Sequence, residues 1–411
     1  MQIVQSTWVR FWHFDLAREL HRQGYLKRIF TSLPWWKAEK ESKEQGIPRD
    51  LISCNFLLQG IRHVGKQVPG YSNSIDTRLG IMQTKSFSRW VANNLPDCDL
   101  YIGISGSGLH AGRIAKSRGA AYIMDRGSTQ IRHADNVLRE EHLKWKMPWQ
   151  ALHPWYIENE EVEASEADII NVPSHFVKQT FVEYGTPADK IRVIPYGVAV
   201  EEFYPVGTPP ENMFRLVFVG QFGVRKGAPY LLQAFKSFNH PNKELIIVGH
   251  VEEEMQTLLD GVNDDKIKFV GVVPRSEVKK YLSTAHALVL PSIEEGLALV
   301  QAQAMACGCP VIATPNTGSE TLFTHLHEGL IIRAQSAASL TDAFTFLSDN
   351  PGKRQDMSNS CLERIRQLGG WKNYGNGVIA VAHEVSGRRS TVDGRPKQFN
   401  NDSKVQRVST L

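Results

Sequence analysis

The sequence lacks the features of several specialised protein classes. No apolar run among its 411 residues approaches the roughly 20 needed to span a bilayer. The N-terminus, MQIVQSTW, has neither the basic start nor the apolar core of a signal peptide. A formal net charge of +4 is small for this length and gives no general case for nucleic acid binding. We therefore expect a cytoplasmic protein that binds no nucleic acid.

Cysteine is scarce and scattered. The five cysteines are odd in number and dispersed, so no disulfide framework is expected. Cys307-Gly308-Cys309 is one residue short of a C-x-x-C pair, and no second pair completes a zinc site. The cysteines therefore give no case for a zinc site. With 42% hydrophobic and 22% charged residues, the composition is that of an ordinary globular protein.

Short β-rich runs alternate with amphipathic stretches along the chain. This alternation predicts an α/β fold with two Rossmann-like, doubly wound parallel-sheet domains facing a cleft. The turn-rich segment 205–210 indicates the boundary, with domains over 1–205 and 206–370. A disordered tail is expected over 386–411, whose six basic and two acidic residues account for the whole net charge. The predicted strands are Ile3–Ser6, Lys27–Thr31, Leu100–Ile104, Ala121–Asp125, Ile169–Val172, Ile191–Ile194, Leu216–Val219, Leu245–Val248, Ile267–Val270, Ala287–Leu290, Pro310–Ala313 and Gly329–Ile332.

The first candidate site is the segment Phe218–Gly227, which runs from a strand through a glycine loop to a helix. Gly220 lets the backbone approach a ligand, and a helix N-terminus favours an anion. Arg225 and Lys226 add two cations, as a diphosphate requires. The alternative interpretation is a tight turn with solvated charges.

The second candidate site is the segment Leu290–Ile312, in which a strand is followed by an acidic turn and a small-residue helix expected from Leu297. Glu295 can accept hydrogen bonds from sugar hydroxyls, while free N–H groups hold phosphate. Gln303 follows eight residues later, about two helical turns on, so both side chains are expected to face one ligand. The alternative is an acidic cap on a buried helix.

Together the two segments resemble the donor-binding half of GT-B glycosyltransferases of family 4 (glycosyl transferases group 1). Lys226-Gly227, Glu295-Gly296 and the run 304–312 fit that family's pattern, as do Val172-Pro173-Ser174 and the run 190–198 between the halves. Residues 371–385 look like the family's last helix, which crosses back to the first domain. Two positions depart from the pattern: Gln221 replaces the usual arginine and Gln303 the second glutamate.

The resemblance implies that the C-terminal half binds a nucleotide-diphosphate sugar and the N-terminal half binds the acceptor. Arg225, Lys226 and the backbone at 297–300 would neutralise the diphosphate leaving group. Glu295 would hold sugar hydroxyls, and Gln303 would bond the ribose through its amide. The predicted donor-binding residues are Gly220, Gln221, Arg225, Lys226, Glu295, Gly296, Leu297, Ala298, Leu299, Val300 and Gln303.

Candidates in the first half carry competing interpretations. Asp125 takes the place where the family has a histidine facing the sugar; it is either a carboxylate near the anomeric centre or a loop residue paired with Arg126. Arg10 and His13 are further candidates on the acceptor side, although a lone histidine is more often structural. Gly106–Gly112 imitates a dinucleotide fingerprint, but its G-x-G-x-x-x-G spacing favours a structural turn.

Eight of the nine tryptophans fall within the first 155 residues. Most are expected in the core. Trp35-Trp36-Lys37, with Lys40 and Lys43, suggests an interfacial patch, and hence peripheral contact with the inner face of a membrane as a hypothesis.

The resemblance implies a retaining, metal-independent glycosyltransferase, of the hexosyltransferase kind, that uses a nucleotide-diphosphate sugar and needs no organic cofactor. The acceptor is expected to be a glycan or lipid-linked saccharide in polysaccharide or glycoconjugate biosynthesis. The resemblance further implies that the leaving phosphate helps to deprotonate the acceptor on the same face. Two alternatives stay open: an NAD(P)-dependent Rossmann oxidoreductase or epimerase built on Gly106–Gly112, and a non-catalytic nucleotide-sugar-binding relative suggested by Gln221 and Gln303.

Overall fold

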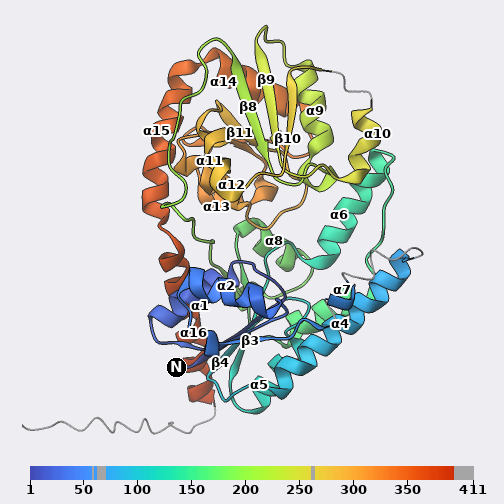
Figure 1. Ribbon diagram of the computed structural model, residues 1–411, viewed down its shortest axis with the longest axis vertical. Coiled ribbons are helices and arrows are strands. Elements are labelled where there is room, and N and C mark those ends of the chain that lie inside the picture. The colour runs from blue at the N-terminus through green and yellow to red at the C-terminus, as the bar shows by residue number, and fades with distance from the viewer. Residues whose placement is uncertain (58–59, 63–70, 261–263, 393–411) are drawn as a thin grey trace, which may run out of the picture.

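A computed structural model describes residues 1–57, 60–62, 71–260 and 264–392. Two α/β domains, each built on a parallel β-sheet, lie one above the other (Figure 1). This arrangement confirms the predicted fold class. No helix within the described residues has both the length and the apolar character needed to cross a membrane.

Within the described residues, the first domain contains a seven-stranded sheet in the order β3-β2-β1-β4-β5-β6-β7. Its strands are β1 (Ile3–Thr7), β2 (Leu26–Thr31), β3 (Ile52–Cys54), β4 (Leu100–Ile104), β5 (Ala121–Asp125), β6 (Ile169–Val172) and β7 (Ile191–Val193). Its helices include α1 (His13–Arg22), α2 (Trp35–Gln45), α4 (Asn73–Asn93), α5 (Leu109–Ser117), α6 (Ile131–Lys144), α7 (Pro154–Glu166) and α8 (His175–Glu183). The strand order reverses between β1 and β4, which is where open sheets place ligands.

The second domain contains six strands among the described residues, in the order β10-β9-β8-β11-β12-β13. These are β8 (Phe214–Val219), β9 (Lys243–Val248), β10 (Ile267–Gly271), β11 (Ala287–Leu290), β12 (Val311–Ala313) and β13 (Gly329–Ile331). The helices include α9 (Ala228–Ser237), α10 (Gln256–Leu259), α11 (Arg275–Ser283), α12 (Leu299–Ala306), α13 (Ser319–Leu322), α14 (Ala337–Asp349) and α15 (Pro351–Leu368). Short 3-10 helices occur in both domains: η1 (Arg49–Leu51) and η2 (Ala188–Lys190) in the first, and η3 (Val224–Lys226), η4 (Glu253–Met255) and η5 (Pro315–Thr317) in the second.

The central strands are buried, and most of their residues are apolar, because helices cover both faces of each sheet. Every residue of β4 and of β11 is buried. The predicted strands match the observed ones within two residues at each end. Strand β3 was not predicted, because three residues at a sheet edge give no readable pattern. Helix α12 begins at Leu299 rather than Leu297, because the loop after β11 stays extended up to Ala298.

The last helix, α16 (Trp371–Val392), crosses back from the second domain and packs against α1 (Figure 1). Its observed end at Val392 corrects the predicted end at residue 385. The tail predicted from residue 386 therefore begins inside this helix, and residues 393–411 lie outside the described part of the chain. Val385 is buried at 4% exposure, so the chain at the predicted boundary is still packed against the fold.

Gly375 sets how closely α16 approaches α1. A Cβ at Gly375 would lie 2.6 Å from the Cβ of Glu19, whereas one at Gly387 would meet nothing within 4 Å. We expect Gly375→Val to destabilise the fold by about 1–3 kcal/mol more than Gly387→Val, because overpacking adds to the same helix penalty. Thermal unfolding followed by circular dichroism tests this pair. Equal melting temperatures would contradict the close packing of α16 on α1.

Candidate active site

Three loops meet where the carboxyl ends of the two sheets face each other. The loop after β8 runs over Gly220–Lys226 and ends in η3. The loop after β11 spans 291–298 and leads into α12, and the loop after β5 spans 126–129 in the first domain. Both halves of the chain therefore contribute to one site, at the sheet ends where ligands bind in open α/β folds.

The loops approach so closely that glycine is required at their contacts. A Cβ on Gly296 would lie 1.8 Å from the carbonyl oxygen of Gly127, across the domain boundary. A Cβ on Gly227 would lie 2.0 Å from the carbonyl oxygen of Pro291. Ser174 Oγ donates a 2.7 Å hydrogen bond to the carbonyl of Gly296, which adds a second contact between the domains. The two domains thus touch through backbone at this point.

Two cations and two carboxylates are held together beside these contacts. Arg225 Nε lies 2.7 Å from Glu294 Oε2, and Arg225 Nη2 lies 3.3 Å from Glu295 Oε1. Lys226 pairs with the other oxygen of Glu295. The arrangement brings together all three of the donor-side residues that were predicted as catalytic.

Glu294 joins this cluster to the first domain. Its Oε1 accepts hydrogen bonds from the backbone N–H of Thr129 at 3.1 Å and from the Thr129 hydroxyl at 2.6 Å. Burial alone would raise the pKa of this carboxyl, but Arg225 and the Thr129 donors together lower it to about 2. Glu294 is therefore a buried carboxylate that stays ionised at neutral pH.

Lys226 is held in a different electrostatic state. Burial, followed by repulsion from Arg225, lowers the pKa of Lys226 to about 7, although Glu294 opposes the shift. Its side chain is 16% exposed and that of Arg225 is 38% exposed, so both cations can still reach a ligand. Anionic groups that entered the site would favour the charged form of Lys226.

The N-terminus of α12 opens onto the same site. Ala298 precedes the helix and supplies no side-chain cap, which leaves the first-turn N–H groups of Leu299 and Val300 without an intrahelical partner. Gln303 is half-buried on this helix, whereas Gln301 is fully buried and bonds Thr317. The helix therefore supplies the backbone donors that a phosphate requires.

Other predicted donor-side positions act through their backbone or face solvent. Gly220 has a φ of +146°, a conformation that L side chains rarely adopt, and so fixes the turn after β8. Gln221 is exposed next to it. Leu297 and Ala298 are each 5% exposed, so their side chains pack in the interior.

Asp125 lies in the interior rather than in an open site. Its carboxylate is 1% exposed and accepts hydrogen bonds from Trp12 Nε1 at 2.7 Å and Asn171 Nδ2 at 2.8 Å. His13 Nε2 lies 3.1 Å away and is fully buried. The predicted pairing of Asp125 with Arg126 is wrong, because the carboxylate is already bonded to these other side chains.

Arg126 is committed to its own domain. It pairs with Glu160 at 2.6 Å and donates to the carbonyl of Thr129 at 2.7 Å and 3.0 Å. Arg10 pairs with Glu41 and lines a cavity of about 830 Å³ between α1, α2 and the interdomain connections. The three predicted acceptor-side residues Arg10, His13 and Arg126 are thus not brought together around one point.

The Gly106–Gly112 turn is closed by a carboxyl group of the chain itself. Glu163 on α7 accepts hydrogen bonds from the backbone N–H groups of Gly106 at 2.6 Å and Gly108 at 2.9 Å. The Tyr122 hydroxyl bonds the same carboxyl group, whose pKa burial raises to about 8. An internal group therefore occupies the place that a dinucleotide phosphate would need, which confirms the structural interpretation of this turn.

Sequence reasoning missed two residues of the site. Glu294 was treated only as part of an acidic turn, yet it links the two domains. Thr129 gave no sequence signal, because its role depends on a contact 165 residues away. No group of three or more His, Cys, Asp or Glu side chains in the described part of the chain is placed to hold a metal ion.

Comparison with known families matches almost the whole chain. A family model described as Glycosyltransferase Family 4 matches residues 13–202, and one described as Glycosyl transferases group 1 matches residues 200–363. A D-inositol 3-phosphate glycosyltransferase of Pseudarthrobacter chlorophenolicus is 29% identical over 234 residues, 51% of this chain and 55% of the relative. The amylovoran biosynthesis glycosyltransferase AmsK of Erwinia amylovora is 27% identical over 187 residues, 43% of this chain and 46% of the relative. The alignments span about half the length of these curated relatives.

Solved structures share the fold over nearly the full length. A sucrose-phosphate synthase from Thermosynechococcus elongatus superposes with a TM-score of 0.70 at 18% identity, covering 94% of this chain and 100% of the other. HepE of Anabaena, solved in complex with UDP, gives 0.68 at 14% identity, covering 93% of this chain and 100% of the other. Two adjoining family models and one fold over both domains show that the chain belongs to the GT-B glycosyltransferases of family 4, the glycosyl transferases group 1.

Proposed function

We propose that this protein transfers a glycosyl group from a nucleotide-diphosphate sugar to a hydroxyl acceptor, with retention of the anomeric configuration. The observation that carries the proposal is the cluster of Arg225 and Lys226 beside Glu295 at the uncapped start of α12. It combines two cations and backbone donors for a diphosphate with a carboxylate that can hold sugar hydroxyls. That HepE was solved with UDP and with UDP-glucose supports a nucleotide sugar as donor.

Donor binding would exchange partners within the cluster. The diphosphate would take Lys226 and the outer face of Arg225, which releases Glu295 from its ion pair with Lys226. Glu295 then accepts hydrogen bonds from the sugar hydroxyls. Gln303, half-buried about one turn into α12, would hydrogen-bond the ribose through its amide. Binding energy of the diphosphate thereby frees the group that orients the sugar.

In the chemical step, the bond between the anomeric carbon and the diphosphate oxygen breaks, and a bond from the acceptor oxygen to that carbon forms on the same face. The acceptor proton passes to the leaving phosphate oxygen. Arg225, Lys226 and the N–H groups of Leu299 and Val300 stabilise the negative charge that develops there. These protein groups act without a metal ion or an organic cofactor in this proposal.

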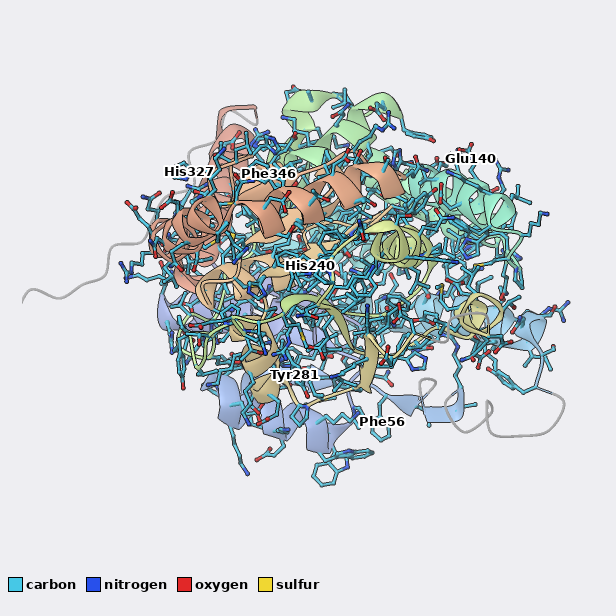
Figure 2. All side chains as sticks on the ribbon, turned by 90° about the horizontal axis from the view of Figure 1, so that it is seen from above. Phe56, Glu140, His240, Tyr281, His327 and Phe346 are labelled. Carbon is cyan, nitrogen blue, oxygen red and sulfur yellow. The ribbon has the colours of Figure 1, made fainter. Side chains whose placement is uncertain are left out.

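The first domain would bind the acceptor, and we propose a glycan or lipid-linked saccharide made in the cytoplasm. The amylovoran biosynthesis glycosyltransferase among the relatives supports a role in polysaccharide assembly. The start of α2 adds a membrane contact to this proposal. Trp35 and Trp36 are 60% and 51% exposed, and Phe56, at the outer edge in Figure 2, lies 5.6 Å from the Trp36 ring. Exposed indole rings of this kind partition into lipid interfaces.

Removing either member of the Lys226–Glu295 pair tests the assignment of the site. We expect Lys226→Met and Glu295→Gln each to lower kcat for sugar transfer by about 100-fold or more, because each removes a charge that acts at the reacting groups. Release of the nucleoside diphosphate in the presence of acceptor measures the rate. Lys236→Met, an exposed position on α9, serves as the matched control. Near-normal turnover by either site variant would contradict the proposed roles. Nucleotide-sugar binding by the wild type without turnover would favour a binding protein.

Donor binding should also depend on pH. A diphosphate requires protonated Lys226, whose pKa of about 7 leaves a growing neutral fraction as the pH rises above 7. We therefore expect affinity for a nucleoside diphosphate to fall by up to about tenfold per pH unit from pH 7 to about pH 9, with uptake of a proton on binding. Calorimetry in buffers of different ionisation enthalpy measures this uptake. Lys226→Met should bind without it, and uptake that persists in that variant would assign the proton elsewhere.

The aromatic surface on α2 gives a separate test. The double substitution Trp35→Ser and Trp36→Ser should abolish co-sedimentation with liposomes of anionic lipid, because it removes the exposed apolar area that enters the interface. Val272→Ser, at a 77% exposed position of the second domain, provides the control. Wild-type protein that stays in the supernatant would refute membrane contact without affecting the proposed reaction.

A further inference from the structure

We propose that Thr129 of the first domain is a positioning residue for donor binding, which acts on the diphosphate site through Glu294. This inference rests on the proposed function of Arg225 as a ligand of the donor diphosphate. It adds that the cation is oriented by the opposite domain, so that a competent donor site forms only when the two domains are closed on each other.

The contacts form an unbroken chain across the domain boundary. Thr129 is fully buried and Glu294 is 2% exposed. The two oxygens of Glu294 have separate partners: Oε1 accepts both Thr129 donors, and Oε2 accepts Arg225 Nε at 2.7 Å. One carboxylate therefore spans from the acceptor domain to a donor-site cation. It leaves the Nη groups of Arg225 on the side that faces Glu295 and the open site.

The loop that carries Thr129 is itself braced. Arg126 donates from Nε and Nη2 to the carbonyl of Thr129, at 3.0 Å and 2.7 Å, and from Nε to that of Ser128 at 3.2 Å. Glu160 holds the same guanidinium at 2.6 Å. Arg126 thus fixes the direction of the Thr129 donors from inside the first domain. The position of Arg126 directly after β5 is thus explained by its hydrogen bonds to this loop, without a role in binding the acceptor.

Electrostatics makes the bridge sensitive to domain separation. A buried carboxylate is stable only when its oxygens are hydrogen-bonded or paired. If the first domain moved away, Oε1 of Glu294 would lose both Thr129 donors, and water or Arg225 would have to replace them. Arg225 would then change its direction toward the donor. Arg225 is therefore oriented toward the donor only when the two domains are closed.

The test compares nucleotide binding in variants that differ in one hydroxyl. Thr129→Val keeps the shape of the side chain and the backbone donor but removes the hydroxyl bond to Glu294, whereas Thr129→Ser retains it. For the nucleoside diphosphate that binds the wild type most tightly in a screen of UDP, GDP and ADP, we expect Thr129→Val to raise the Kd about tenfold. Thr129→Ser should stay within about twofold of the wild type. Thr84→Val is the control: Thr84 is a buried threonine whose hydroxyl donates to the carbonyl of Gly80 within α4.

A double-mutant cycle separates positioning from a general loss of packing. Glu294→Gln should weaken binding by a similar factor, and the combination with Thr129→Val should weaken it no further, because both changes break one bridge. KM for the donor should rise in these variants more than kcat falls. Additive effects, or an unchanged Kd in either single variant, would overturn the inference. Failure of the wild type to bind any nucleoside diphosphate would instead refute the proposed function, and the inference with it.

Discussion

The carboxylate of Glu294 is the interaction on which the arrangement of the site depends. It is buried between two domains, and it remains ionised because a cation lies on one side and two hydrogen-bond donors on the other. If the first domain were absent, this carboxylate would lose both Thr129 donors, and a buried carboxylate is destabilised when its oxygens lack such partners. The conformation of the loop after β11 is therefore coupled to the first domain.

Uncharged backbone contacts also join the two domains at this site. Gly296 touches the carbonyl of Gly127, and Ser174 bonds the carbonyl of Gly296. These contacts bring the start of α12 toward the end of β5, so that the uncapped N–H groups of Leu299 and Val300 open onto the interdomain boundary. Helix α16 adds a further contact between the domains, because it follows the second domain in the chain and packs onto α1 of the first. The fold thus contributes to the chemistry by setting how close the domains come.

The parts of the site that could be predicted are those whose residues lie close together along the chain. The sheets were predictable because buried parallel strands are rich in apolar residues, and Arg225, Lys226 and Glu295 were predictable because each stands at a strand-to-helix turn. For Asp125 the sequence left two interpretations open, because its partners are far away along the chain: Trp12 lies at the start of α1 and Asn171 lies on β6. The tertiary structure shows that the carboxylate belongs to a buried network. Thr129 was invisible for the same reason.

Two strand-to-helix turns in this chain begin with similar local chemistry and end differently. Both place free N–H groups at a helix start, and such groups need hydrogen-bond acceptors. At Gly106 and Gly108 the chain supplies the acceptor itself, the carboxyl group of Glu163 on a neighbouring helix. At α12 no side-chain cap is supplied, and Arg225 and Lys226 lie beside the open end. Such a turn therefore identifies a demand for hydrogen-bond acceptors. Whether a ligand meets that demand is decided by what the rest of the fold has already placed there.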